Sequence, residues 1–92
     1  MNYINIMAHL NWKDYVSFDP NICHGKAHIT GTRVTISVIL DCLAEGMDDG
    51  DILENYPSLK KEHILAALQY GALLARDEII PLTKPQGQES EI

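Results

Sequence analysis

The clearest hydrophobic pattern in the chain begins at residue 36 and has the spacing of an amphipathic helix. Its apolar positions follow i, i+3, i+4, i+7 and i+11, and they are Ile36, Ile39, Leu40, Leu43 and Met47. Thr35 or Ser37 can cap the start of this helix, because a hydroxyl oxygen accepts a hydrogen bond from a free backbone N–H. Gly46 can end the helix by adopting a left-handed conformation.

Two further helices are predicted downstream. Asp48 can cap a short helix with Ile52 on its apolar face, and Pro57 stops that helix. The third and longest helix is expected over about 60–78. One of its faces is rich in small residues, which permit close approach of another helix. That helix can belong to a second subunit or to the core of the same chain, and the sequence does not decide between the two. These small residues are Ala66, Ala67, Gly71, Ala72 and Ala75.

Period-two alternation predicts two short strands before the helices. Residues 16–18 and 33–36 alternate apolar with polar side chains, and Gly25 and Gly31 punctuate the loop between them. So small a strand pair needs a helix or a second subunit to support it. The complete pattern predicts a mainly α fold in which a short N-terminal β element precedes three helices.

The length of 92 residues fits one small domain. We expect an N-terminal extension over residues 1–14, the folded domain over 15–80 and a flexible acidic tail over 81–92. No positively charged start followed by a long apolar core is seen, and the two cysteines, Cys23 and Cys42, are too few for a disulfide scaffold. These features favour a soluble, cytoplasmic protein without a membrane segment.

The charge is unevenly distributed along the chain. Seven basic and thirteen acidic residues give a formal net charge of −6, which argues against binding nucleic acid through overall positive charge. No acid lies between Asp19 and Asp41, however, and Lys26 and Arg33 fall in this stretch. This acid-free stretch is consistent with a surface that binds an anion, and equally with a loop that merely lacks carboxylates.

Candidate chemistry is sparse. Cys23, His24 and His28 have side chains that bind zinc, but a structural zinc site needs four ligands in a suitable arrangement. We therefore expect no metal or other cofactor, and we interpret Cys23 as a small buried apolar residue. No nucleophile, base and orienting group stand together in the sequence, so an enzyme is not expected.

Two motifs carry a resemblance to a known family. They are D-P-x-I-C-x-G-K-x-x-I-x-G-T-R-V from residue 19 and Y-P-x-L from residue 56. In them the chain resembles the domain-of-unknown-function family 433, described as VapB-like antitoxins. The resemblance implies a short β element, a homeodomain-like three-helix bundle with a helix-turn-helix, and frequent assembly as a homodimer or higher homo-oligomer.

The function that this resemblance implies is that of an antitoxin in a type II toxin-antitoxin pair. Such a protein binds and neutralises a PIN-like ribonuclease toxin and can repress its own operon by binding operator DNA. The alternative is a stand-alone helix-turn-helix transcriptional regulator.

Two departures from the family pattern affect local structure. The family usually reads Cys-Gly-Gly-Lys-Pro where this chain has His24 and Ala27 in place of the first glycine and the proline. We therefore expect a less tightly turned and more polar loop. Lys60 stands where the family often has a capping threonine, and because lysine cannot accept a backbone N–H, Ser58 is expected to cap the third helix.

Candidate binding residues follow from these roles. In a helix-turn-helix the start of the second helix meets the base pairs, and loop cations can add phosphate contacts. The DNA-binding candidates are Lys26, Arg33, Lys60, Lys61 and His63. The C-terminal region could lie in the basic substrate channel of a ribonuclease, and the toxin-binding candidates are Arg76, Asp77, Glu78, Lys84, Glu89 and Glu91. Arg33 has a competing structural role, which is an ion pair with Asp41 or Asp19.

Overall fold

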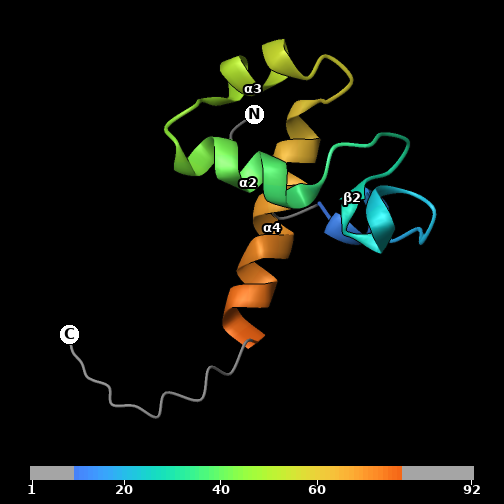
Figure 1. The fold of residues 1–92 in the computed structure, drawn as a ribbon. Coiled ribbons are helices and arrows are strands. Elements are labelled where there is room, and N and C mark those ends of the chain that lie inside the picture. The colour runs from blue at the N-terminus through green and yellow to red at the C-terminus, as the bar shows by residue number, and fades with distance from the viewer. Residues whose placement is uncertain (1–9, 78–92) are drawn as a thin grey trace.

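The computed structural model describes residues 10–77 of the chain and shows a small, mainly α domain (Figure 1). The helices are α2 (Ile36–Ala44), α3 (Asp49–Asn55) and α4 (Lys61–Asp77). Before them come the 3-10 turns η1 (Trp12–Asp14) and η2 (Cys23–Gly25) and the strands β1 (Val16–Ser17) and β2 (His28–Ile29). The expected fold class, with a short β element before three helices, is confirmed.

Helix α2 has the boundaries that its sequence pattern predicts. The Thr35 hydroxyl accepts the Val38 N–H at 3.3 Å and caps the first turn, as expected. At the other end Gly46 has a φ of +96° and ends the helical path. Met47 belongs to the apolar stripe in sequence but lies after this turn, where it packs against the core from outside the helix.

Helix α3 is short and depends on its N-terminal cap. Asp48 caps it as predicted, and its carboxylate accepts the Asp51 N–H at 2.9 Å. The Asp51 carboxylate in turn accepts the Asp48 N–H at 3.2 Å, so the two residues form a reciprocal capping box. The helix ends one residue before Tyr56, which is the position that the following Pro57 restricts.

The predicted position of the second strand is wrong. Antiparallel pairing joins Val16 to Ile29, so β2 is formed by residues 28–29 rather than 33–36. Residues 34–36 do return alongside β2, because the Ile29 N–H donates to the Val34 carbonyl at 2.9 Å, but Thr35 makes only an isolated bridge to His28. The chain must turn here to start α2, so it leaves the sheet after one bridge.

The hydrophobic core lies between α2, α3, the start of α4 and the small sheet. Its fully buried members include Ile29, Ile39, Ile52 and Ile64. On α4, Ala66 and Ala67 are also fully buried. Part of the small-residue face of α4 is therefore used for packing within the chain, which is one of the two interpretations that the sequence left open.

Helix α4 extends well beyond the helices that pack against it. In Figure 1 its N-terminal half lies beside α2 and α3, and its C-terminal half extends beyond them. Gly71 lets α4 pack closely on α2, since a Cβ placed there would lie 3.0 Å from Leu40 Cδ1. Among residues 10–77, no helix is long and apolar enough to cross a membrane.

Candidate functional site

Three of the DNA-binding candidates gather at the start of α4. Lys60 and Lys61 are exposed, and His63 is half-buried. The Lys61 ammonium lies 3.6 Å from a carboxylate oxygen of Asp49 on α3. Because α3 supplies this acid, part of the positive charge at the start of α4 is neutralised within the chain.

His63 closes the first turn of α4. The Lys60 backbone N–H donates to His63 Nδ1 at 2.8 Å. The side chain that accepts a backbone N–H at the start of α4 is therefore that of His63 and not that of Ser58, which the sequence predicted. The imidazole also meets the Tyr15 ring edge-on, with centroids 5.7 Å apart. Desolvation by these surroundings lowers the pKa of His63, with Lys60 acting in the same direction and Glu62 against it. A neutral imidazole makes this residue a cap rather than a phosphate contact.

The His63 cap predicts that stability falls with acidity. A histidine whose pKa is lower in the folded chain binds its proton more readily when unfolded. The contribution of His63 to stability is therefore complete above its ordinary pKa of 6.5 and is lost as the pH falls below that value towards the folded pKa. We expect a lower free energy of unfolding at pH 5 than at pH 7.5, measured by urea denaturation.

The matched variant is His63→Gln, because a glutamine at this helix position also accepts the Lys60 N–H but does not titrate. It should show a smaller loss of stability between the two pH values than the wild type. Equal losses in the two proteins would assign the pH dependence to other groups.

The other two DNA-binding candidates, Lys26 and Arg33, do not lie at the start of α4. Lys26 lines a pocket whose other side is formed by Tyr70 and Leu74 of the C-terminal half of α4. Leu74 is roughly 20 Å along the helix axis from Lys61, at 1.5 Å per residue. Lys26 therefore does not join the cations at the start of α4. Arg33 is exposed, and within residues 10–77 it makes no ion pair with Asp41 or Asp19, contrary to expectation.

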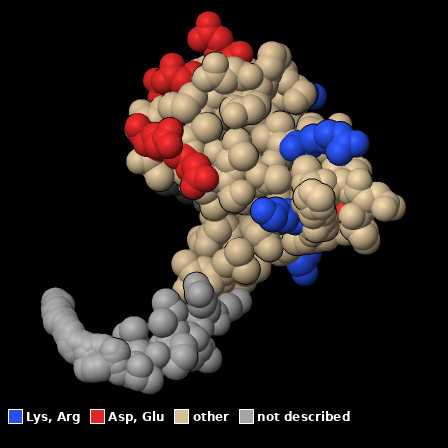
Figure 2. All heavy atoms as spheres, in the orientation of Figure 1, with Lys and Arg blue, Asp and Glu red and all other residues tan. Residues whose placement is uncertain are grey.

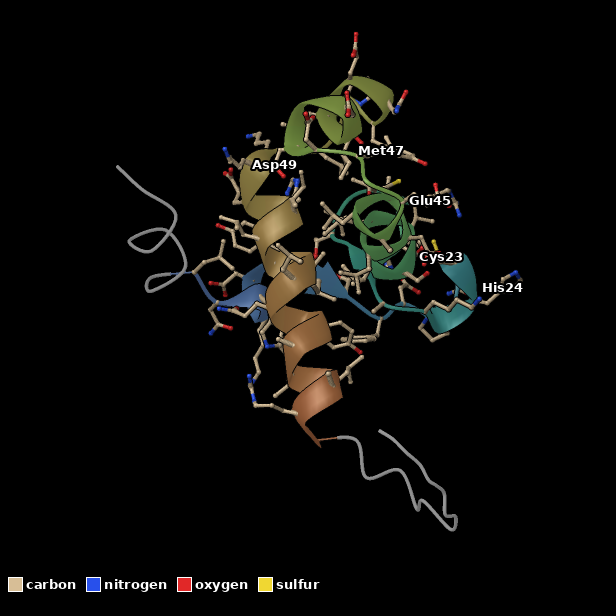
Figure 3. All side chains as sticks on the ribbon, turned by 90° about the vertical axis from the view of Figure 1, so that its left-hand side faces the viewer. Cys23, His24, Glu45, Met47 and Asp49 are labelled. Carbon is tan, nitrogen blue, oxygen red and sulfur yellow. The ribbon has the colours of Figure 1, made fainter. Side chains whose placement is uncertain are left out.

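The loop before β2 is a tight left-handed turn, so the expectation of a looser loop is wrong. Cys23, His24 and Gly25 have φ values of +54°, +57° and +80°. The turn is closed by the Gly25 N–H on the Ile22 carbonyl and by the Cys23 thiol, which donates to the Arg33 carbonyl at 3.4 Å. Cys23 is half-buried, and the His24 side chain points away from the domain (Figure 3). The turn therefore holds two residues with side chains in a conformation that suits glycine.

We expect His24→Gly to raise the free energy of unfolding by about 1 kcal/mol. Left-handed backbone costs a residue with a Cβ roughly 1–2 kcal/mol, and the greater freedom of glycine in the unfolded chain offsets part of the gain. Urea denaturation measures the change. His24→Ala keeps the Cβ and should bring no such gain, so equal stability of the two variants would contradict strain at this position.

His28 is buried for a structural reason. It is 1% exposed, and its Nδ1–H donates to the Lys26 carbonyl at 2.9 Å. This bond ties β2 to the left-handed turn. Over residues 10–77 no group of three or more histidine, cysteine, aspartate or glutamate side chains is arranged to hold a metal ion.

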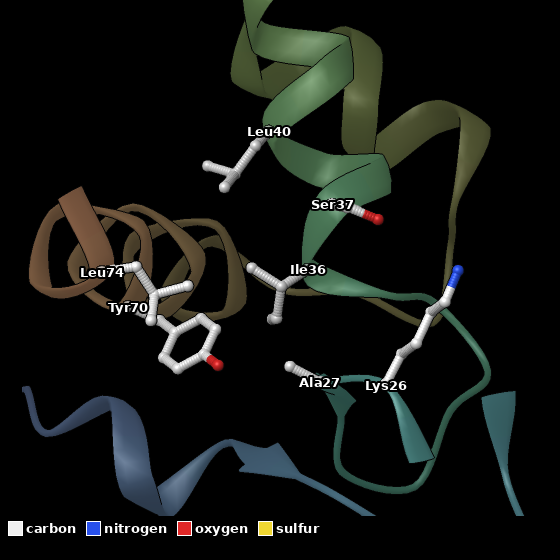
Figure 4. A pocket seen from close by; sticks show the side chains of 7 residues that line it. All are labelled: Lys26, Ala27, Ile36, Ser37, Leu40, Tyr70 and Leu74. Carbon is white, nitrogen blue, oxygen red and sulfur yellow. The ribbon is translucent and has the colours of Figure 1, made fainter. Parts of the chain in front are cut away.

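A groove that the sequence did not reveal lies between α2 and the C-terminal half of α4 (Figure 4). Its volume is about 360 Å³, and its walls are mainly apolar. The lining residues are Lys26, Ala27, Ile36, Ser37, Leu40, Tyr70 and Leu74. We call this feature the α2–α4 groove. Because Ala27 and Leu74 are far apart in sequence, no local pattern could have brought them together.

A second surface is strongly acidic. Between Asp41 and Glu54 the chain has six carboxylates and no lysine or arginine, and all but one of these carboxylates are exposed. We call this set the acidic face: Asp41, Glu45, Asp48, Asp49, Asp51 and Glu54. Figure 2 shows acidic side chains over α3 and one end of α2, with the visible lysines and arginines on the other side. In this view the carboxylates over α2 and α3 lie apart from the visible lysines and arginines.

The toxin-binding candidates fall mostly beyond the described residues. Arg76 is exposed in the last turn of α4, and Asp77 is the last residue of that helix. Glu78, Lys84, Glu89 and Glu91 lie outside residues 10–77.

Comparison with known proteins identifies the family. The chain matches the family described as "Protein of unknown function (DUF433)" over residues 16–71. The crystal structure of a DUF433 member protein from Anabaena variabilis ATCC 29413 has a similar fold, with 24% sequence identity and a TM-score of 0.65. The similarity covers 83% of this chain and 92% of that one. No curated protein matches the chain. Since the family match spans more than half of its residues, the chain belongs to the DUF433 family of proteins of unknown function.

Proposed function

We propose that this protein is a non-enzymatic antitoxin that binds and neutralises a PIN-like ribonuclease in the cytoplasm. The observation that carries this proposal is the acidic face, which offers six carboxylates on α2, α3 and the turn between them. A ribonuclease must attract a polyanion, so its substrate channel is rimmed by basic groups. A surface that carries six carboxylates competes with RNA for such a channel.

The capping box supports this use of the surface. It holds two of the carboxylates, Asp48 and Asp51, against backbone N–H groups, which limits their rotation. A charged surface that is already ordered loses less conformational entropy on binding than a mobile one. Both thiols are also free, as expected for a protein that works in a reducing compartment.

The test is co-expression with the product of the adjacent gene, followed by affinity purification and an RNase assay. We expect a complex in which the ribonuclease is inactive and from which salt releases it. Glu45→Lys and Glu54→Lys should weaken inhibition by about tenfold or more, which corresponds to about 1.4 kcal/mol. Asp14→Lys makes the same charge change at an exposed site outside the acidic face and should leave inhibition unchanged.

Two results would count against this proposal. Absence of any complex would remove the antitoxin function. A complex that all three variants weaken equally would remove the acidic face as its binding surface. A chain ending at residue 80 measures the separate contribution of the C-terminal candidates Lys84, Glu89 and Glu91.

Operator binding is a second candidate function, favoured by the exposed Lys60 and Lys61 in the second helix of the α3–α4 pair. It ranks below the first because Asp49 pairs with Lys61 and the other charged residues of α3, Asp51 and Glu54, are also acids. A mobility-shift assay on the DNA upstream of the gene tests it. We expect a salt-sensitive shift that Lys60→Ala/Lys61→Ala abolishes, and no shift would exclude this function.

A further inference from the structure

We propose that the α2–α4 groove binds a small amphipathic carboxylate, a medium-chain fatty acid, with its acyl chain between α2 and α4 and its carboxylate at Lys26. The groove is separate from the acidic face, because none of the six residues of that face lines it. This inference concerns a ligand of the folded chain, and it stands whether or not a ribonuclease is bound.

The size and the walls of the groove suit an acyl chain. Its volume is about 360 Å³, and pockets that bind small organic molecules have roughly 300–1,000 Å³. The apolar walls include the aliphatic side chains of Ile36, Leu40 and Leu74 and the ring of Tyr70. The Leu74 side chain is 51% exposed, so a ligand in the groove covers apolar surface that water otherwise contacts.

The polar groups of the groove lie on one side. In Figure 4 Lys26 and Ser37 lie on the side opposite Tyr70 and Leu74, with Ile36 between them. Lys26 is exposed, and within residues 10–77 no ion pair involves its ammonium. A ligand that spans the groove therefore meets a cation at one end and apolar side chains at the other. A carboxylate joined to an aliphatic chain has the same division into a charged and an apolar part.

The backbone that carries this cation is held in place. The Lys26 N–H donates to the Cys23 carbonyl at 3.0 Å, and the Lys26 carbonyl accepts from Nδ1–H of the buried His28 at 2.9 Å. The next residue is joined to the start of α2, because the Ile36 N–H donates to the Ala27 carbonyl at 3.0 Å. The loop with the cation and the helix that forms one wall are thus tied together, and a preformed site loses less conformational entropy on binding.

The charge of the groove also distinguishes its occupant from the ribonuclease. The acidic face attracts basic groups, whereas the Lys26 ammonium repels them and attracts an anion. None of the residues that line the groove carries a carboxylate that would oppose this attraction. The groove therefore favours an anionic ligand over the basic rim of a substrate channel.

The experiment is isothermal titration calorimetry of the full chain with octanoate, in the absence of any partner protein. We expect one octanoate to bind per chain. The alcohol 1-octanol has an aliphatic chain of the same length without the charge, and it should bind about fivefold more weakly or worse, because it cannot pair with the ammonium. Acetate has the carboxylate without the chain and should not bind detectably.

Charge variants test the position of the head group. Lys26→Glu should raise the Kd for octanoate by about tenfold or more, because it replaces attraction by repulsion, and should change the Kd for 1-octanol by less than about twofold. Lys60→Glu makes the same charge change at an exposed lysine just before α4, and it should leave both Kd values unchanged.

Variants of two exposed leucines test the position of the acyl chain. Leu74→Asp should raise the Kd for octanoate by about 30-fold or more, because it places a carboxylate in the apolar wall. Leu68→Asp introduces the same charge at an exposed leucine of α4 that does not line the groove, and it should leave the Kd unchanged. Far-ultraviolet circular dichroism establishes that each variant is folded.

Three outcomes would overturn the proposal. One is that octanoate does not bind, and the second is that 1-octanol binds as tightly as octanoate. The third is that the members of either matched pair of variants weaken octanoate binding equally. If octanoate does not bind and Leu74→Asp instead weakens binding of the ribonuclease, the groove belongs to that partner and not to a fatty acid.

Discussion

Replacing Ile39 by alanine should lower the free energy of unfolding by about 3 kcal/mol. Ile39 is fully buried on α2, in the core cluster that also contains Ile29 and Ile64. The substitution removes methyl and methylene groups from a site with neighbours on all sides, so the loss combines transfer free energy with the cost of a cavity. A domain of this size is stabilised by roughly 3–10 kcal/mol in total, so one residue removes a large part of it.

Urea denaturation followed by circular dichroism measures this loss. The midpoint should fall with little change in the slope, because the surface exposed on unfolding is almost the same. Leu68→Ala is the matched control, since Leu68 is an aliphatic helix residue that is 41% exposed. We expect it to cost less than about 1 kcal/mol. A similar small loss for Ile39→Ala would mean that α2 does not pack on α4 as described.

The features that the sequence predicted correctly are those determined by neighbouring residues. The threonine cap at Thr35 and the aspartate cap at Asp48 each depend on a side chain and an N–H three residues away. The ends of α2 and α3 depend on one residue each, Gly46 and Pro57. The buried face of α2 likewise follows from its spacing, and Ile36 and Ile39 are buried as the pattern requires.

The features that the sequence did not predict correctly are of two kinds. Some depend on contacts between segments that are distant along the chain, and others depend on which of several neighbouring residues forms a strand or a cap. Alternation at residues 33–36 is genuine, but only Thr35 bridges to β2, because Thr35 must also cap α2. His63 could not be recognised as the cap of α4 from residue type alone, since a histidine must be neutral and correctly oriented to accept the Lys60 N–H.

The candidate sites likewise depend on contacts between segments that are distant along the chain. The sequence located an acid-free stretch and a cluster of cations at the start of α4. It could not show that Lys26 lines a pocket with the C-terminal half of that helix, whereas Lys61 lies at its start. It also attributed the acidic character mainly to the C-terminal tail. The run of six carboxylates from Asp41 to Glu54, which contains no lysine or arginine, could have been read from the sequence. The structure adds that all but one of them are exposed and that acidic side chains lie over α3 and one end of α2.

The longest-range feature that the sequence did not predict is a clamp made by one side chain, and its removal should also have a large effect. Gln69 Oε1 accepts the Trp12 N–H at 2.7 Å, and its Nε2–H donates to the Leu10 carbonyl at 3.0 Å. The clamp holds the segment around η1 on α4, where the Trp12 ring lies 4.8 Å from that of Tyr70. We expect Gln69→Ala to cost about 2 kcal/mol, because two hydrogen bonds are lost and backbone groups are left partly buried without partners.

The local consequence distinguishes this variant from an ordinary core substitution. Trp12 is the single tryptophan of the chain, so its fluorescence reports on this segment alone. In Gln69→Ala, acrylamide should quench Trp12 more strongly in the folded state, because the segment around it is released from α4.

Gln69→Met provides the control, since it retains a side chain of similar length but can neither donate nor accept these bonds. If the clamp acts through hydrogen bonding, Gln69→Met resembles Gln69→Ala in both stability and quenching. If Gln69→Met instead behaves like the wild type, the segment is held by the packing of the side chain and of the Trp12 ring, and the two hydrogen bonds contribute little.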